Sequence, residues 1–324
     1  TKISSSLAAA NTIVTSSTDI AADISGSFRS GFNTKGAISS KGPGSWVQGP
    51  NYPNGPYGST AGGTQNAILK WGGYSSDSTY TDAFDGVAWS GRADLPWKVC
   101  KNERAGTQDD MLAMRGKMSG SADYSNSICN ASIHYNGTVW SQRAYLLKSS
   151  ATGTSTGFGI SNAAIANKSQ PTEEYDGISW FAAAGTQIER TGGAGAGIVN
   201  AGIVGGGYPA SNTGCSTELY DGNSWTVGPK AATCRNGGMI AGTQNDAITF
   251  GGEGGDYNTE AWDGTSWSRL GDGPQFYYSG NGAGFGGSTN AFGLREGGMY
   301  TWLWNGADYQ TTASLGIVTP TKGI

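Results

Sequence analysis

Four carboxylates that recur at one place in a repeated pattern are the residues best suited to chemistry in this chain. Each stands two residues before an aromatic side chain that is followed by Asp-Gly: Asp82, Glu173, Glu218 and Glu260. Paired carboxylates can act as general acid and base in glycosidic bond cleavage. Because the acid returns copy after copy, we instead expect it to serve the repeat, by accepting the N–H of a nearby indole or by capping a strand edge. No catalytic residue is predicted.

The single histidine, His134, precedes the sequence Tyr135-Asn136-Gly137. Catalysis by a nucleophile, a histidine and an acid would have to use this one residue. We expect His134 to be a surface residue of an edge strand, beside a turn.

Four cysteines are present without a Cys-x-x-Cys motif: Cys100, Cys129, Cys215 and Cys234. Together with the single histidine, this spacing predicts no zinc site. We expect free, half-buried thiols, and the alternative is a disulfide such as Cys100–Cys129. Neither a cofactor nor a metal is predicted, although acidic loops are able to hold calcium.

The composition favours an all-β protein with many short strands and tight turns. Glycine contributes 55 of the 324 residues, while 11 tryptophans and 15 tyrosines supply apolar surface for a core, so disorder is not expected. The formal charge is −4, and there is no basic stripe for nucleic acid. No run approaches the roughly 18 apolar residues of a membrane span, and the first residues do not resemble a secretory signal.

The Asp-Gly turn itself recurs along the chain. An aromatic residue, then Asp-Gly or Asn-Gly, then a tryptophan three residues after the glycine return at a mean interval of 44, with markers at Trp89, Trp140, Trp180, Trp225, Trp267 and a decayed copy at Tyr309. Trp46 marks a seventh, divergent copy. Asp-Gly is typical of two-residue hairpins in which both central residues have positive φ. In such a hairpin Tyr220 faces Asn223, and Glu218 faces Trp225.

Two further landmarks keep a nearly fixed distance from the tryptophans. A small-residue segment such as Ala105-Gly106-Thr107-Gln108 follows after 16 residues, and a glycine mark such as Gly251-Gly252 follows after 26 or 27. From that mark to the next tryptophan or tyrosine the distance varies from 14 to 24. Small residues suit an inner strand, where sheets crowd toward an axis, and tryptophan suits a wider radius. A period near 44 made of four short strands predicts a β-propeller.

We expect an all-β, seven-bladed β-propeller of four-stranded antiparallel blades, and the alternative is six blades with an irregular N-terminal segment. One domain would cover 1–324, with blades at about 15–50, 51–93, 94–144, 145–184, 185–229, 230–271 and 272–324. The first blade depends on marks at Ala21-Ala22-Asp23-Ile24 and Arg29-Ser30-Gly31. Closure of the ring is expected from packing alone, or from the first dozen residues lying against the last blade.

The repeat resembles a known family. An apolar strand ending in Phe250-Gly251-Gly252, then Tyr-Asp-Gly and a tryptophan, resembles the kelch repeat, and Ala241-Gly242-Thr243-Gln244 adds a resemblance to kelch-like arrays of phage virion and tail-fibre proteins. The resemblance covers residues 20–310 and is specific for the fold. It implies a non-enzymatic virion component, such as a tail-fibre, receptor-binding or capsid-attached protein, made in the host cytoplasm.

The partners implied by the resemblance are other virion proteins or a host surface glycan, with no nucleic acid and no membrane insertion, and an oligomer is compatible with it. A bacterial lectin or protein-interaction module, with an extracellular location, is the alternative. A glycosidase or lyase is the third possibility.

Function is expected where the repeat varies, in the connection between the Gly-Gly strand and the first hairpin strand. These connections emerge on one face of a propeller. A rigid aromatic side chain beside adaptable polar groups is the usual chemistry for binding sugars or protein surfaces. The longest such loop, 117–131, is the best single candidate. The predicted ligand-binding residues are Tyr74, Asp77, Tyr80, Asp123, Tyr124, Asn126, Tyr208, Asn212, Asp256, Tyr257 and Tyr300.

Overall fold

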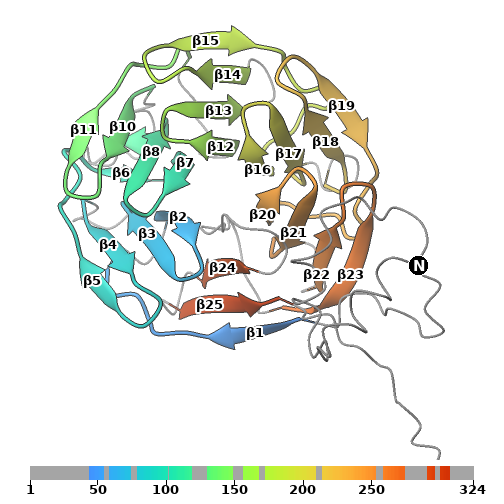
Figure 1. The fold of residues 1–324 in the computed structure, drawn as a ribbon, viewed down its shortest axis with the longest axis horizontal. Helices are drawn as coiled ribbons and strands as arrows, with labels where there is room; N and C mark the ends of the chain where they lie inside the picture. Colours follow the sequence, from blue (N-terminus) through green and yellow to red (C-terminus); the bar gives the residue numbers. More distant parts are fainter. Residues whose placement is uncertain are drawn as a thin grey trace, which may run out of the picture. The chain divides into compact units, whose positions relative to one another are not determined.

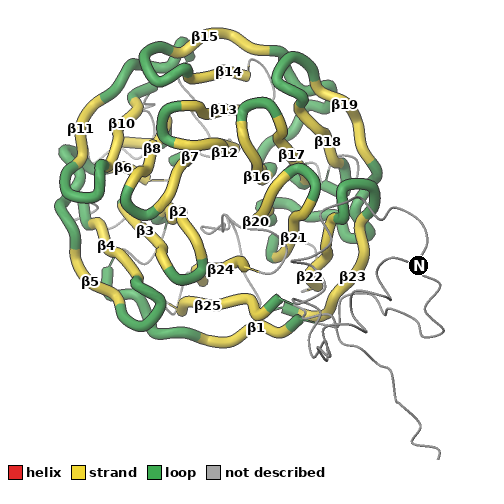
Figure 2. The backbone as a smooth tube through the Cα atoms, viewed as in Figure 1, coloured by secondary structure: helices red, strands yellow, loops and turns green. Residues whose placement is uncertain are grey.

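The computed structural model describes residues 44–54, 58–73, 79–100, 102–118, 130–148, 156–167, 172–208, 214–252, 258–273, 290–295 and 300–306. Every regular element in these ranges is a β-strand. Figures 1 and 2 show the strands as short sheets arranged around a common axis, which makes this part of the chain a β-propeller. Within it, no helix has the length and apolar character that a membrane crossing requires.

Five blades are four-stranded and antiparallel, with the first strand innermost. Blade 1 consists of β2 (Thr60–Thr64), β3 (Ala67–Trp71), β4 (Thr81–Phe84) and β5 (Trp89–Gly91). Blade 2 consists of β7 (Glu103–Thr107), β8 (Asp110–Met114), β10 (Ser132–Tyr135) and β11 (Trp140–Gln142). Blade 3 consists of β12 (Thr156–Ile160), β13 (Ala163–Asn167), β14 (Thr172–Tyr175) and β15 (Trp180–Ala183).

Blades 4 and 5 repeat the same order. Blade 4 consists of β16 (Ala194–Ile198), β17 (Ala201–Gly205), β18 (Thr217–Tyr220) and β19 (Trp225–Gly228). Blade 5 consists of β20 (Met239–Thr243), β21 (Asp246–Phe250), β22 (Asn258–Trp262) and β23 (Trp267–Asp272). A two-stranded ladder of β6 (Val99–Cys100) and β9 (Lys117–Met118) lies outside the blades.

Blade 6 combines the two ends of the described chain. From the axis outward, its described strands are β24 (Asn290–Arg295), β25 (Tyr300–Asn305) and β1 (Ser45–Gln48). The expected inner strand, with the mark at Ala283-Gly284, lies outside the described residues. Neighbouring inner strands contact one another in the order β2, β7, β12, β16 and β20, and β24 contacts both β20 and β2. The ring is therefore closed.

The propeller has six blades, so the expected seven is wrong and the alternative number is right. Trp46 does not belong to a blade of its own, because β1 pairs with β25 and sets Trp46 opposite Trp304. This cross-strand pair is equivalent to Tyr220 opposite Trp225 in blade 4. The marks that suggested a further blade, at 21–24 and 29–31, lie outside the described residues. Closure is made by strand pairing and not by packing alone.

A glutamine side chain joins each of three blades to the blade before it in the ring. One of these bonds joins blade 1 to blade 6, where the ring closes. Nε2 of Gln108 donates to the carbonyl of Phe84 at 2.7 Å, and Nε2 of Gln244 donates to that of Tyr220 at 2.7 Å. In the same way, Gln65 of blade 1 donates to the carbonyl of Trp304 in blade 6 at 3.0 Å. The seam between the first and last blades is thus built like the others.

The hydrophobic core lies between the blades, because both faces of each sheet are covered by a neighbour. One cluster joins Leu69 and Trp71 of blade 1 to Met111 of blade 2. Close approach near the axis requires glycine: a Cβ on Gly157 would lie 2.6 Å from Cε of Met114. This confirms the expected use of small residues on inner strands.

The hairpin turn differs from the expected two-residue form. In blade 4 the pairs are Tyr220 with Trp225 and Glu218 with Val227, so four residues separate the strands and the predicted register is wrong. Oδ1 of Asp221 accepts the N–H groups of Asn223 at 2.8 Å and Ser224 at 2.7 Å, which is an Asx turn. Only the glycine of the turn has positive φ, +96° at Gly222. The aromatic rings are stacked, with centroids 4.7 Å apart.

The alternating strand directions give the ring two faces. We call the end that carries the hairpin turns the turn face, formed by 65–66, 85–88, 108–109, 136–139, 161–162, 176–179, 199–200, 221–224, 244–245 and 263–266. We call the opposite end the loop face. Its described residues are 72–73, 79–80, 206–208 and 214–216, and the inter-blade segments 92–98, 143–148, 184–193 and 229–238.

Candidate functional site

The loop face is built from two kinds of segment that alternate around the ring. The connection between the second and third strands of a blade lies beside the segment that enters the next blade. Gly207 N donates to Arg235 O at 2.8 Å, and Gly73 N donates to Val99 O at 2.9 Å. In blades 1 and 4 the variable connection is therefore held by main-chain hydrogen bonds to a segment of constant length, which is the geometry of a preformed binding surface.

The recurring acids lie beneath this face and hold the inter-blade segments. Glu218 is fully buried and accepts the N–H groups of Gln187 at 2.6 Å and Ile188 at 3.3 Å. Its charge is compensated by Arg190, which donates Nη2 to the carboxylate and Nη1 to Ser216 O at 3.3 Å. Burial lowers the pKa of Arg190, and Glu218 opposes that shift. Because a buried charge is tolerated only when paired, these groups act as one unit.

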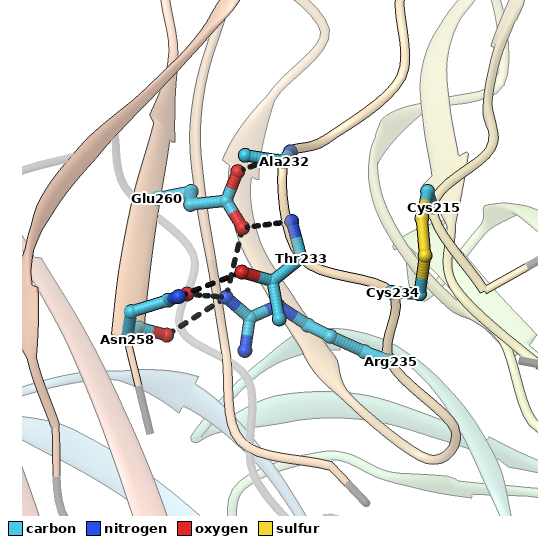
Figure 3. The surroundings of a disulfide bond; sticks show 7 residues. All are labelled: Cys215, Ala232, Thr233, Cys234, Arg235, Asn258 and Glu260. Atoms are coloured by element: carbon cyan, nitrogen blue, oxygen red, sulfur yellow. Dashed lines mark hydrogen bonds and ion pairs between the residues drawn. A yellow bond between two sulfur atoms is a disulfide. The ribbon is translucent and has the colours of Figure 1, made fainter. Parts of the chain in front are cut away.

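Blade 5 repeats this unit (Figure 3). Glu260 accepts the N–H of Ala232 at 2.7 Å and that of Thr233 at 3.0 Å. Arg235 donates Nη2 to Glu260 at 3.0 Å and also to the side chain of Asn258. Thr233 in turn accepts from Asn258 Nδ2 at 2.6 Å. The carboxylate thus fixes the segment that leads from blade 4 into blade 5.

Blades 1 and 3 use cations from other places for the same purpose. Glu173 accepts the N–H of Leu147 at 2.6 Å, and its cation is Arg115 of blade 2, at 2.6 Å. In blade 1, Asp82 lies 3.9 Å from Nζ of Lys70 and accepts from Asn54 Nδ2 at 3.1 Å. Four recurring acids therefore each hold the segment that enters their own blade.

The indole N–H groups do not bind these acids, so that expectation is wrong. Of the six tryptophans on the described outer strands, four donate to a threonine hydroxyl in the preceding blade. Nε1 of Trp140 binds Thr81 at 2.9 Å, and Nε1 of Trp267 binds Thr217 at 2.9 Å. Across the closure, Nε1 of Trp89 binds Thr301 at 3.2 Å. Thr81 and Thr217 each stand immediately before a recurring acid, so in an extended strand the threonine side chain faces the neighbouring blade while the acid faces the other way.

Tyr208 is the most exposed aromatic residue of the loop face in the described part of the chain, with 61% of its surface accessible. Its backbone is fixed to the segment that enters blade 4: Tyr208 N donates to Thr191 O at 2.6 Å, and Thr191 N donates to Tyr208 O at 3.2 Å. The preceding Gly207 is bonded to Arg235 on the other side. The ring is thus presented by a braced main chain.

Tyr80 is the second predicted residue with a described side chain, and it is 36% exposed. It lies in blade 1, across the ring from Tyr208 in blade 4 (Figure 1). The two tyrosines therefore share a face but do not form one compact site. Tyr300 begins β25, where its backbone pairs with Arg295. The other predicted residues lie outside the described part: Tyr74, Asp77, Asp123, Tyr124, Asn126, Asn212, Asp256 and Tyr257.

A disulfide joins Cys215 to Cys234, so the expectation of free thiols is wrong for this pair. Cys215 precedes β18 and Cys234 lies in the segment that enters blade 5, beside the Arg235 unit (Figure 3). The bond ties a variable connection to the segment that carries the cation. Cys100 is buried, and Cys129 lies outside the described residues, so the pairing Cys100–Cys129 stays a prediction.

His134 lies in β10, between β8 and β11, so it does not belong to an edge strand as expected. Its Nε2 contacts Asp110, and Ser161 donates its hydroxyl to that same aspartate and not to the histidine. This order differs from a nucleophile–histidine–acid relay, in which the histidine is central.

The cations beneath the loop face were not anticipated from sequence, although a signal exists. Arg190 and Arg235 each follow the blade tryptophan by ten residues, at Trp180 and Trp225. No protein-family model and no curated protein matches this chain.

Proposed function

We propose that this chain is a non-enzymatic attachment protein, a kelch-like propeller of the phage virion or tail fibre, which presents its loop face to a host surface glycan or to neighbouring virion proteins. The observation that carries the proposal is the braced presentation of Tyr208. An exposed aromatic ring on a fixed backbone loses little conformational entropy on binding, and such rings supply stacking surface for sugars and for protein partners.

The buried ion pairs add support. Because Glu218 and Glu260 each hold an inter-blade segment through two main-chain N–H groups, the loop face is stiffened from below. A stiff face can present different loops on one scaffold, as attachment proteins require. Several blades would then contribute weak sites whose combined strength exceeds that of any one.

The proposal is tested by binding of the purified chain to an array of bacterial surface polysaccharides and to host cells. We expect Tyr208→Ala to weaken binding at least about tenfold, which corresponds to about 1.4 kcal/mol. Phe181→Ala is the matched control, because Phe181 is an exposed aromatic residue on the outer strand β15 and should not affect binding. Equal binding by Tyr208→Ala and wild type would contradict the proposal.

A bacterial lectin or protein-interaction module would use the same face, and a glycan array that reveals several equivalent weak sites favours the lectin. An enzyme, such as a glycosidase or lyase, would need acids outside the buried set. Replacement of Asp77, Asp123 and Asp256 by asparagine tests this third possibility. Loss of a detected hydrolytic or eliminative activity in such a variant would support an enzyme.

A further inference from the structure

Four polar side chains form a continuous chain on blade 2 and across its seam with blade 3, from Arg143 at the loop-face end of β11 to Asp110 at the turn-face end of β8 and Ser161 of blade 3. Asp110 begins β8 and lies at the centre. Its Oδ1 is 2.5 Å from Nε2 of His134, and its Oδ2 accepts the hydroxyl of Ser161 in blade 3 at 2.7 Å. On the other side of the imidazole, Nδ1 lies 2.8 Å from Nη2 of Arg143, which follows β11.

The hydrogen-bonding partners determine where the histidine proton lies. A guanidinium can only donate, so Nδ1 of His134 must accept from Arg143 and carry no proton. The proton is then on Nε2 and is donated to the carboxylate of Asp110. Burial raises the pKa of Asp110, but the hydrogen bonds from His134 and Ser161 outweigh it and hold this pKa below its ordinary value. The carboxylate is therefore charged and able to accept both bonds.

A second proton on the ring would fall on Nδ1. Two donors, both positively charged, would then face each other across 2.8 Å, an arrangement that is repulsive. On the Nε2 side, protonation strengthens the contact with Asp110, because an imidazolium binds a carboxylate more strongly than a neutral imidazole does. Protonation thus leaves His134 bound to Asp110 and expels Arg143.

We propose that His134 is a proton-operated latch, which holds Arg143 against blade 2 while the ring is neutral and releases it when the ring is protonated. The side chain of His134 is 13% exposed and that of Asp110 is 58% exposed, so protons reach the cluster from solvent. Histidine is the side chain that ordinarily changes charge near neutral pH. The latch makes the position of Arg143, at the loop-face end of blade 2, sensitive to acid.

The charged surroundings of the latch come from both blades. Asp110 and Arg143 face the imidazole itself, and Asp109 and Arg92 act on the neighbouring Tyr135. In blade 3, burial raises the pKa of Tyr175, while Arg143 opposes and Asp176 supports that shift. Arg143 therefore acts electrostatically on Tyr175 of blade 3 as well as on Asp110 of its own blade.

Because His134 is the only histidine in the chain, every imidazole signal in a long-range ¹H–¹⁵N spectrum reports on it. We expect a proton on Nε2 and none on Nδ1 at about pH 8. On progressive acidification Nδ1 should gain a proton, and the side-chain nitrogen signals of Arg143 should change with the same midpoint. A proton on Nδ1 at about pH 8, or Arg143 signals that ignore the titration, would overturn the proposal.

Two variants distinguish a latch operated by protonation of His134 from a contact that does not respond to pH. Arg143→Met removes the repelling cation, so the midpoint of the histidine titration should move to higher pH by about one unit. Arg92→Met is the control, because Arg92 follows β5 as Arg143 follows β11 and binds Ser90 in place of a histidine. It should leave the midpoint unchanged. An unchanged midpoint in Arg143→Met, or equal shifts in both variants, would also overturn the latch.

Discussion

Trp46 and Trp304 lie opposite each other across β1 and β25, with ring centroids 5.3 Å apart. One belongs to the first described strand of the chain and the other to the last. Nε1 of Trp46 also donates to Thr259 of blade 5 at 3.0 Å, as other blade tryptophans do to the blade before them. Two segments from opposite ends of the described chain thus share one blade, and their pairing closes the ring.

The indole of Trp46 should contribute strongly to stability. Trp46→Ala removes its contacts with Trp304 and Phe250 together with the hydrogen bond to Thr259, so we expect the free energy of unfolding to fall by about 3 kcal/mol or more. Val47→Ala in the same strand, at an exposed position, should cost no more than about 0.5 kcal/mol. Urea denaturation of both variants makes the comparison, and equal losses would contradict the role given to Trp46.

Breaking one partner of a buried ion pair should cost more than removing both. Arg190→Met leaves the carboxylate of Glu218 buried without its cation, and we expect a loss of about 3–5 kcal/mol. The double variant Arg190→Met with Glu218→Leu should be less destabilised than this single variant. Arg269→Met, from an exposed pair with Asp272, should cost at most about 1 kcal/mol. If the stability loss of the double variant equals the sum of the losses of the two single variants, the two residues are not coupled.

Lys70 gives a pH dependence with a defined sign. Burial lowers its pKa from 10.5 to about 8, although Asp82 opposes the shift. Between these two values the unfolded chain binds a proton that the folded chain has released, so the free energy of unfolding rises with pH in this window. Lys70→Met lacks this dependence, and the stability difference between wild type and variant should move in favour of wild type as pH rises from 8 toward 10.5.

The control for this titration is Lys230→Met, since Lys230 is exposed. Its stability difference from wild type should be flat over the same range. Guanidinium denaturation at a series of pH values measures both differences. A flat stability difference for Lys70→Met would mean that the amine keeps its ordinary pKa in the fold, and an opposite slope would mean that folding raises this pKa. Either result would contradict the prediction.

The disulfide between Cys215 and Cys234 encloses a segment of sequence separation 19. Its removal by the double change to serine should lower the free energy of unfolding by about 2–4 kcal/mol. Thiol alkylation and peptide mass analysis of the unreduced wild type should find both cysteines protected. Ready alkylation of the native protein at these positions would contradict the bond.

The blade architecture could be predicted from sequence because it is set by local spacing. The stretch from Trp225 to Gly251-Gly252 leads from the outer strand of one blade through the two inner strands of the next. Its length is constant because every copy crosses the same distance between the rim and the axis. The number of blades could not be obtained in this way. Trp46 keeps the same spacing to the next copy whether it ends a first blade of its own or supplies the outer strand of the last blade, and only the long-range pairing with Trp304 distinguishes the two.

The predictions of the hairpin register and of the binding partners of the acids were wrong for a related reason. Asp221 builds a four-residue turn through its side chain, and the dipeptide Asp-Gly alone does not distinguish this turn from a two-residue one. Glu173 receives its cation from Arg115 of another blade, a choice made by packing between sheets. Tyr208 lies exposed on a variable connection, and its bracing by Thr191 depends on a tertiary contact that local spacing does not predict.

Closure of the ring through β1 is most directly tested by cross-linking the partners Ser45 and Asn305. In the variant with Ser45→Cys and Asn305→Cys, a short thiol-reactive cross-linker should join the two positions within one chain, as found by peptide mass analysis. The matched pair Ser45→Cys with Thr226→Cys, on the outer strand of blade 4, should give no such product. A link between 45 and 305 that forms no more readily than the one between 45 and 226 would contradict a six-bladed ring closed by the two ends of the chain.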